Sequence, residues 1–411
     1  MSFIIWILVA IVLLFVIEYY FIRKVLTSFK FLYPNFPFSK YKKIITAVIV
    51  YINLYMLLVI LAYSYTMITQ GDRPVPPESW LFDYFILFPF WLSMIVFVQC
   101  GLLYLLLDIL KIIAYPLYKK YKDRILPLKA KLILVIAVVF MIYVPIRVIY
   151  DYNSVSLRVV EFKKKNLPND LREFKIAFIS DIQADRYTNN NRLERFISKV
   201  NSTYPDLVLI AGDMITSTPN YINTSAKYVG MIKSKYGIYS CVGDHDNWAY
   251  WRDSERSLHE IKEALKEKNV HMIDNGKIEF IIKNSKLNVT FVTNTYVEII
   301  SSETLDSLTR LDKNYDVNIF LTHQPRNKFI EAATMHDYDL LLAGHTHGGQ
   351  ITFFFPFYNL SATLIETKYV RGDFWFGDML MVVTRGLGMS LLPMRYNSTP
   401  EVTLITLHNK D

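Results

Sequence analysis

Residues 339–350 read DLLLAGHTHGGQ, a short apolar strand that leads directly into a glycine-rich loop with two histidines. Four other apolar runs between Phe174 and this stretch end in the same manner, each at a carboxylate or an imidazole. They are KIAFIS before Asp181, LVLIA before Asp213, IYSCV before Asp244 and VNIFL before His323. Helical patterns fill the gaps at about 191–201, 254–268 and 326–334. Strands that alternate with helices predict a layered α/β domain.

The loops at the carboxyl ends of such strands are expected to share one edge of a sheet, so their polar residues form one site. His345 and His347 are two residues apart, which places both side chains on the same side of an extended segment. Glycines directly before Asp213, Asp244 and His345 allow the backbone to turn sharply beside these residues.

Carboxylates and imidazoles without a thiolate suit manganese, iron, zinc or similar ions, and a carboxylate such as Asp213 can bridge two of them. Two bridged ions activate water at neutral pH and hold the oxygens of a phosphoryl group. The chain has only two cysteines, Cys100 and Cys241, so neither a disulfide framework nor a cysteine-built metal site is expected.

The ordered elements D-x-(H), GD, GN-H-(D/E), H and GHxH, in the form they take here, resemble the calcineurin-like metallophosphoesterase superfamily. The segment GHTHGGQ is most similar to its membrane-associated bacterial branch, which includes UDP-2,3-diacylglucosamine hydrolase-like and transmembrane metallophosphoesterase proteins. The resemblance runs from about Phe174 to the C-terminus. It implies a four-layer α/β/β/α sandwich with two divalent metal ions.

The resemblance also implies a role for each motif residue. The first metal would be held by Asp181, Gln183, Asp213 and His347, and the second by Asp213, Asp244, His323 and His345. His245 would act as the general acid or contact the phosphate, oriented by Asp246. Beyond the motifs, we expect Arg395 to contact the substrate phosphate. Gln350 is a candidate substrate-binding residue that could instead support the metal loop or only satisfy backbone groups.

Two positions depart from the family pattern, with Gln183 in place of histidine and Asp244 in place of asparagine. An amide oxygen is a harder ligand than imidazole, and the extra carboxylate adds negative charge at the second site. Our hypothesis is that Mn²⁺ or Mg²⁺ is preferred, with iron or zinc possible. The alternative is a catalytically degenerate domain that only binds a metal or a ligand.

The first 150 residues contain four apolar stretches long enough to cross about 30 Å of hydrocarbon. They are residues 3–21, 44–68, 80–107 and 132–150. Lysine and arginine are concentrated in the first and third connecting loops, whereas the second has only Arg73. Because cytoplasmic loops carry this excess, the pattern predicts an integral membrane protein with both termini on the extracytoplasmic side.

We therefore expect a transmembrane region over 1–150, a linker with the first strand over 151–171, and a metallophosphoesterase domain over 172–411. The net charge of +8 does not indicate nucleic-acid binding, since many basic residues lie in the loops between apolar stretches. No ionisable residue occupies the middle of a predicted span, which disfavours a transporter.

Two apolar stretches after the motif loops bear on the substrate, ITFFFPFY at 351–358 and LGMSLLPM at 387–394. They are either buried sheet edges or a rim that enters the outer leaflet of the bilayer. The second interpretation predicts that the enzyme hydrolyses a lipid-linked phosphomonoester, phosphodiester or pyrophosphate.

Overall fold

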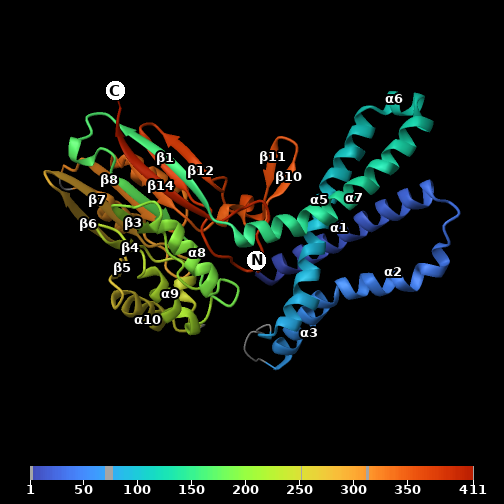
Figure 1. The fold of residues 1–411 in the computed structure, drawn as a ribbon, viewed down its shortest axis with the longest axis horizontal. Helices are drawn as coiled ribbons and strands as arrows, with labels where there is room; N and C mark the ends of the chain where they lie inside the picture. The colour runs from blue at the N-terminus through green and yellow to red at the C-terminus, as the bar shows by residue number, and fades with distance from the viewer. Residues whose placement is uncertain (1–2, 70–76, 251, 312–313, 411) are drawn as a thin grey trace. The chain divides into compact units, whose positions relative to one another are not determined.

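The computed structural model describes residues 3–69, 77–250, 252–311 and 314–410 (Figure 1). The chain divides into two compact units. One comprises Met1–Arg147 together with Phe353–Asn359, and the other comprises Val148–Thr352 together with Leu360–Asp411.

Among its described residues, the first unit consists of helices and one hairpin. Its helical segments are α1 (Phe3–Leu32), α2 (Phe38–Ile52), α3 (Leu54–Thr69), α4 (Trp80–Phe82), the π-helix η1 (Asp83–Leu87), α5 (Phe88–Ile113), α6 (Tyr115–Lys120) and the greater part of α7 (Lys122–Asn153). The hairpin strands are β10 (Phe353–Phe355) and β11 (Tyr358–Leu360).

Two continuous helical stretches among the described residues are long and apolar enough to cross a membrane, Trp80–Ile113 and Lys122–Asn153. The pair Phe38–Ile52 and Leu54–Thr66, bent by 47°, gives a third if it forms a single span. These segments contain the predicted spans 80–107, 132–150 and, for the bent pair, most of 44–68.

The predicted span 3–21 lies in α1, and most side chains in the first turns of that helix are outside the described part of the chain. Arg73, on which the predicted orientation partly depends, is also outside the described residues. The count of four spans and the extracytoplasmic orientation therefore stay predictions.

The second unit contains two six-stranded mixed sheets. The first has the order β1-β14-β2-β3-β4-β5, with bounds Ser156–Lys164, Glu401–Asn409, Lys175–Ile179, Leu207–Ile210, Ile238–Ser240 and Val270–Met272. The second has the order β12-β13-β9-β8-β7-β6, with bounds Gly372–Phe376, Met379–Val383, Leu340–Ala343, Val317–Thr322, Ser285–Val292 and Gly276–Ile282. Strands β2 to β5 are mutually parallel, as are β7, β8, β9 and β13.

Alternate residues of β2 belong to different hydrophobic cores, as the two-residue period of a strand requires. Ile176 and Phe178 lie in a core that also contains residues of β7, β8 and β9 from the other sheet. Ala177 and Ile179 lie in a second core with residues of three helices, α8 (Asn190–Asn201), α9 (Ile222–Val229) and α10 (Ser254–Lys266). A third core joins the second sheet to α11 (Ser302–Thr309) and α12 (Asn327–Met335).

The prediction of an α/β domain built on strand-end loops is confirmed. The strands predicted before Asp181, Asp213, Asp244, His323 and His345 correspond to β2, β3, β4, β8 and β9. The predicted helices correspond to α8, α10 and α12. Because these strands are parallel within each sheet, the loops at their carboxyl ends lie along one edge of each sheet, and ligands from the two edges meet at the site.

Candidate metal centre

Five of the seven predicted metal ligands have a backbone φ angle in the left-handed region. They are Asp181 (52°), Gln183 (45°), Asp213 (60°), His345 (69°) and His347 (50°). Non-glycine residues rarely adopt this conformation, and such strain is concentrated at functional sites. The loops after β2, β3 and β9 are therefore bent at positions that the motifs selected.

One group of metal-type ligands consists of Asp244, His323 and His345, which come from three different loops. Nδ1 of His345 lies 2.9 Å and Nε2 of His323 lies 3.3 Å from the same oxygen, Oδ2 of Asp244. The two imidazole nitrogens are 3.3 Å apart. All three residues belong to the predicted second metal site, and one carboxylate and two imidazoles face a common point there.

A second group consists of Asp181, Asp213 and His323, with one ligand atom from each lying within 4.8 Å of the others. Nε2 of His323 is 3.5 Å from Oδ2 of Asp213. The loops around Asp213 approach so closely that a Cβ added to Gly212 would lie 2.4 Å from the backbone nitrogen of Gly243. Glycine at this point is what allows the two groups to be adjacent.

Gln183 and His347 complete the predicted first site at somewhat longer distances. Nε2 of Gln183 donates to Oδ2 of Asp213 at 2.9 Å and lies 3.5 Å from Nε2 of His347. Nε2 of His347 is 3.7 Å from Oδ1 of Asp181. Oε1 of Gln183 is buried and has no hydrogen-bond partner. A half-turn of the amide exchanges Oε1 and Nε2, so an unpaired oxygen ligand can face Asp213 and His347.

The buried charges of the centre also favour a cation. Burial opposes protonation of His345, but hydrogen bonds with Asp244 and Glu366 outweigh it and raise the pKa of His345 to about 9. Burial lowers the pKa of His347 to about 3, against the attraction of Asp181. The pKa of Asp244 is lowered because hydrogen bonds with His323 and His345 outweigh its burial.

Burial also opposes protonation of His323, but Asp213 and Asp244 outweigh it and raise the pKa of His323 well above its usual value, so protons on His323 and His345 offset the carboxylate charge. Neutral imidazoles and ionised carboxylates are the forms that bind metal, so divalent ions would replace those protons. Together with the unpaired oxygen of Gln183, this donor set fits the two divalent ions that the motifs imply.

His245 begins the short 3₁₀ helix η4 (His245–Asn247), and its ring is fixed at both nitrogens. Nδ1 lies 2.5 Å from the backbone oxygen of Thr216, and Nε2 lies 3.0 Å from Oγ of Ser390. The expectation that Asp246 orients this ring is corrected by the structure. The Asp246 carboxylate accepts instead from the backbone N–H groups of Asp213, Met214 and Gly243.

Arg395 and Gln350, which we predicted as substrate contacts, are both buried and hold the backbone of the site. The Arg395 guanidinium donates to the carbonyl oxygens of Gly388, His347, Arg385 and Ser398. It also lies 3.3 Å from Nδ1 of His347. The Gln350 amide donates to the carbonyls of Ser390, Leu392 and Met394. A fully buried guanidinium with these partners is not placed to contact a phosphate, so the geometry corrects the expectation for Arg395.

Three residues around the centre were not found from the sequence. The Gln324 amide donates to both oxygens of Asp244, and the backbone N–H of Tyr296 donates to Oδ1 of the same carboxylate. Oε2 of Glu366 lies 3.1 Å from Nε2 of His345. Gln324 directly follows His323 and could have been considered for that reason, whereas Glu366 lies in no recognisable motif.

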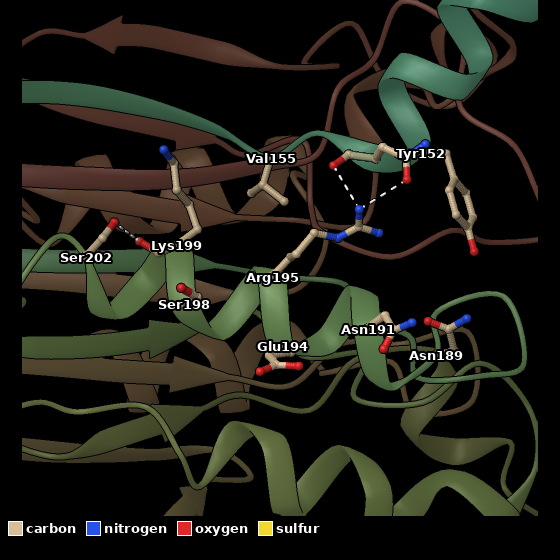
Figure 2. Close-up of a pocket in the computed structure, with 10 residues that line it drawn as sticks. Tyr152, Val155, Asn189, Asn191, Glu194, Arg195, Ser198, Lys199 and Ser202 are labelled. Carbon is tan, nitrogen blue, oxygen red and sulfur yellow. Dashed lines mark hydrogen bonds between the residues drawn. The ribbon is translucent and has the colours of Figure 1, made fainter.

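A separate cavity of about 770 Å³ lies between the end of α7 and the helix α8 (Figure 2). Its lining includes Tyr152, Asn189, Arg195 and Lys199 but none of the predicted metal ligands. Nη1 of Arg195 donates to both the backbone and the side-chain oxygen of Asn153 (Figure 2). This cavity therefore contains the contact between α7 and α8 and not the candidate metal centre.

Strand-end carboxylates and imidazoles gathered in this way can hold divalent metal ions, and the family match places them in a metal-dependent phosphoesterase hydrolase. A family model described as calcineurin-like phosphoesterase matches residues 174–349, and the chain contains a calcineurin-like metallophosphoesterase domain. An uncharacterized metallophosphoesterase of Campylobacter jejuni is 27% identical over 321 residues, which cover 74% of this chain and 76% of that protein.

Of two further relatives, one is named for its membrane location and the other for its activity. A transmembrane protein with a metallophosphoesterase domain from Danio rerio is 27% identical, over 60% of this chain and 56% of that protein. The phosphodiesterase YaeI of Escherichia coli is 28% identical, over 62% of this chain and 88% of that protein. Transmembrane relatives and the apolar helices of this chain both indicate association with a membrane.

Proposed function

We propose that this chain is a membrane-anchored phosphoesterase with a dinuclear metal centre, which hydrolyses a phosphoester or pyrophosphate bond of a lipid-linked envelope substrate. The observation that carries the proposal is the adjacency of two ligand groups, Asp244 with His323 and His345, and Asp181 with Asp213 and His323. The proposal includes a four-layer α/β/β/α arrangement of the two sheets and their helices, on the extracytoplasmic side of the membrane.

In this proposal the first ion is held by Asp181, Gln183, Asp213 and His347, and the second by Asp213, Asp244, His323 and His345. Such ions, when bound, would lower the pKa of a water molecule and neutralise the charge of the phosphate. Gln183 and Asp244 favour Mn²⁺ or Mg²⁺ over iron or zinc. Gln183 replaces a softer imidazole by a harder amide oxygen, and Asp244 replaces a neutral amide by a charged carboxylate.

His245 is the residue of this chain that we propose to serve the leaving group. The carbonyl of Thr216 accepts from Nδ1 of His245, which leaves Nε2 as the nitrogen that can exchange a proton with a substrate oxygen. The hydroxyl of Ser390 now occupies this position at 3.0 Å. A substrate oxygen that replaces the hydroxyl would lie within reach for general acid catalysis.

The alternative is a degenerate domain that binds a metal or a ligand without catalysis, and the surroundings of Asp244 argue against it. The amide of Gln324 donates to both carboxylate oxygens, and the backbone N–H of Tyr296 donates to Oδ1. An asparagine at this position would turn its own NH₂ group against one of these donors. The donors around Asp244 are thus arranged for a carboxylate. This supports a metal site that is adapted to aspartate and has kept its ligands.

Two exposed apolar residues support a lipid-linked substrate. Phe354 is 53% exposed and Leu391 is 95% exposed, and each follows a loop that carries site residues. Apolar side chains of this kind have a lower free energy among the acyl chains of a bilayer than in water. The phosphodiester activity in the name of the Escherichia coli relative supports a diester as the first substrate class to test.

The full-length chain in detergent should hydrolyse p-nitrophenyl phosphate or bis-p-nitrophenyl phosphate when Mn²⁺ or Mg²⁺ is added. The variant Asp213→Ala removes a carboxylate shared by both proposed sites and should abolish turnover of the preferred ester. A folded full-length protein that hydrolyses neither ester with Mn²⁺, Mg²⁺ or Zn²⁺ would favour the degenerate binding domain.

A further inference from the structure

The hairpin of β10 and β11 is hydrogen-bonded to an apolar helix through one glutamine. Gln99 lies in α5, is fully buried, and donates from Nε2 to the backbone oxygen of Phe354 at 2.8 Å. The backbone N–H of Phe354 donates back to Oε1 of Gln99 at 2.9 Å. A buried amide is costly unless both its donor and its acceptor are paired, and here the N–H and C=O groups of one residue, Phe354, pair both.

The depth of Gln99 in the membrane can be judged from a charged cluster on the same helix. Asp108 binds Lys24 and Lys129 at 2.6 Å each and accepts from the hydroxyl of Tyr20. Charged groups of this kind are typical of a membrane boundary. Gln99 is nine residues from Asp108 along the helix, or about 14 Å at 1.5 Å per residue. Half of a hydrocarbon layer is about 15 Å, so Gln99 lies near its middle if Asp108 marks the boundary.

Irregular backbone is tolerated at that depth only where protein groups satisfy its N–H and C=O groups. The backbone N–H and C=O groups of Phe354 meet this condition through Gln99. A glutamine in the middle of an apolar span is thus explained by the strand that it binds.

The outer surface of the hairpin is aromatic. Residues 353–358 read FFFPFY, and Phe354, Phe357 and Tyr358 are 53%, 104% and 61% exposed. Phe357 at the tip has a φ angle of 68°, a conformation that costs a bulky side chain free energy. A strained tip that exposes a whole phenylalanine side chain is unfavourable in water and favourable among acyl chains.

We propose that the hairpin Phe353–Leu360 is embedded in the bilayer, with its aromatic tip in contact with lipid acyl chains and its backbone held by Gln99. Phe353 follows Gln350 of the metal loop by three residues, so the hairpin ties that loop to the membrane. This placement goes beyond the proposed function and holds whether or not the substrate is a lipid.

The experiment uses the full-length chain in vesicles of phosphatidylcholine and phosphatidylglycerol, with a nitroxide spin label on Phe357→Cys. Collision with oxygen reports contact with lipid, and collision with a water-soluble nickel chelate reports contact with water. Ile281→Cys, on a strand of the other unit, is the control for water, and Val138→Cys, in α7, is the control for lipid; both positions are more than half exposed. The native Cys100 and Cys241 are buried, so the unsubstituted chain gives the background.

The proposal requires that the label at position 357 resemble the label at 138, with high oxygen and low nickel accessibility. Nickel accessibility equal to that at 281 would overturn it. Low accessibility to both reagents would also overturn it, since the tip would then be covered by protein. None of these outcomes depends on phosphoesterase activity, so failure here is distinct from failure of the proposed function.

The role of Gln99 is tested in the same labelled background. Gln99→Met has a similar shape without hydrogen bonds and should give a severalfold rise in nickel accessibility at position 357. Gln99→Glu, when protonated in the apolar interior, keeps one donor and one acceptor and should leave the tip in the lipid. Release of the hairpin by both variants, or by neither, would contradict the hydrogen-bond role of Gln99. The measurement on the chain with unsubstituted Gln99 still decides whether the tip is in the bilayer.

Discussion

The amide nitrogen of Gln324 lies 2.9 Å from Oδ1 and 2.8 Å from Oδ2 of Asp244, so one side chain donates to both oxygens of this carboxylate. The contact shows that the aspartate at a position where the family has asparagine is matched by its surroundings. It also makes the departure from the family testable.

Asp244→Asn should weaken metal binding, because the new NH₂ group faces the Gln324 donor in either orientation of the amide. An unsatisfied buried polar group costs about 1–3 kcal/mol, which corresponds to about 5- to 140-fold weaker Mn²⁺ binding by calorimetry. Gln324→Glu in the same chain supplies an acceptor and should restore part of the loss. Asp306→Asn, at a half-exposed position outside both ligand groups, is the matched control. Unchanged or tighter Mn²⁺ binding by Asp244→Asn would show that the surroundings are not adapted to a carboxylate.

Gln183→His should shift the metal preference of the protein towards zinc or iron. Imidazole is a better ligand than an amide oxygen for these borderline ions. We expect the variant to retain more zinc than the unsubstituted protein after dialysis, measured as metal content per chain. If the unsubstituted protein already retains stoichiometric zinc and gains no rate with Mn²⁺, the hypothesis of a Mn²⁺ or Mg²⁺ preference is wrong.

Glu366→Gln should lower metal affinity without unfolding the domain. Glu366 lies 3.1 Å from Nε2 of His345 and also accepts from the hydroxyl of Tyr296. A carboxylate on the far side of a histidine ligand fixes the ring and raises its basicity, and its loss typically weakens metal binding about 10- to 100-fold. Mn²⁺ titration of the folded protein measures this change, with the exposed Glu303→Gln as the control. Equal affinity in all three proteins would limit Glu366 to packing.

Phe354→Asp and Leu391→Asp should reduce turnover of a lipid-linked phosphoester while turnover of a small soluble ester is retained. A carboxylate at either exposed position cannot enter the acyl region without a large desolvation cost. The ratio of the two rates is the measurement, and Ile281→Asp in the second sheet is the control. Equal loss on both esters would show that these residues support the fold or the centre and not the lipid.

The strands and helices that position the site could be predicted because their signals are local. An apolar run that ends in glycine and a charged residue reads as a strand end from a few neighbouring residues. The boundaries of β2, β3, β8, β9, α8, α10 and α12 accordingly agree with the patterns. The ligand positions followed from the same signals, although their roles as metal ligands stay predictions.

The contacts that only the tertiary structure decided join residues far apart in the chain. Asp246 was expected to orient His245, but its buried carboxylate is occupied by three backbone N–H groups, and the carbonyl of Thr216 takes that role. Arg395 was expected at the phosphate, but it is fully buried among carbonyls. Residues that are neighbours in a motif need not contact each other, because the local backbone conformation decides where each side chain points.

By itself, the sequence determined the α/β class, the strand-end loops and the apolar helices, since each depends on periodicity over short stretches. The tertiary structure decided how Gln324 pairs with Asp244, how Glu366 meets His345, and how Gln99 binds the backbone of a residue 255 positions away. These are hydrogen bonds of single donors and acceptors, which leave no periodic signal in the chain and exist only once folding has brought the groups within about 3 Å.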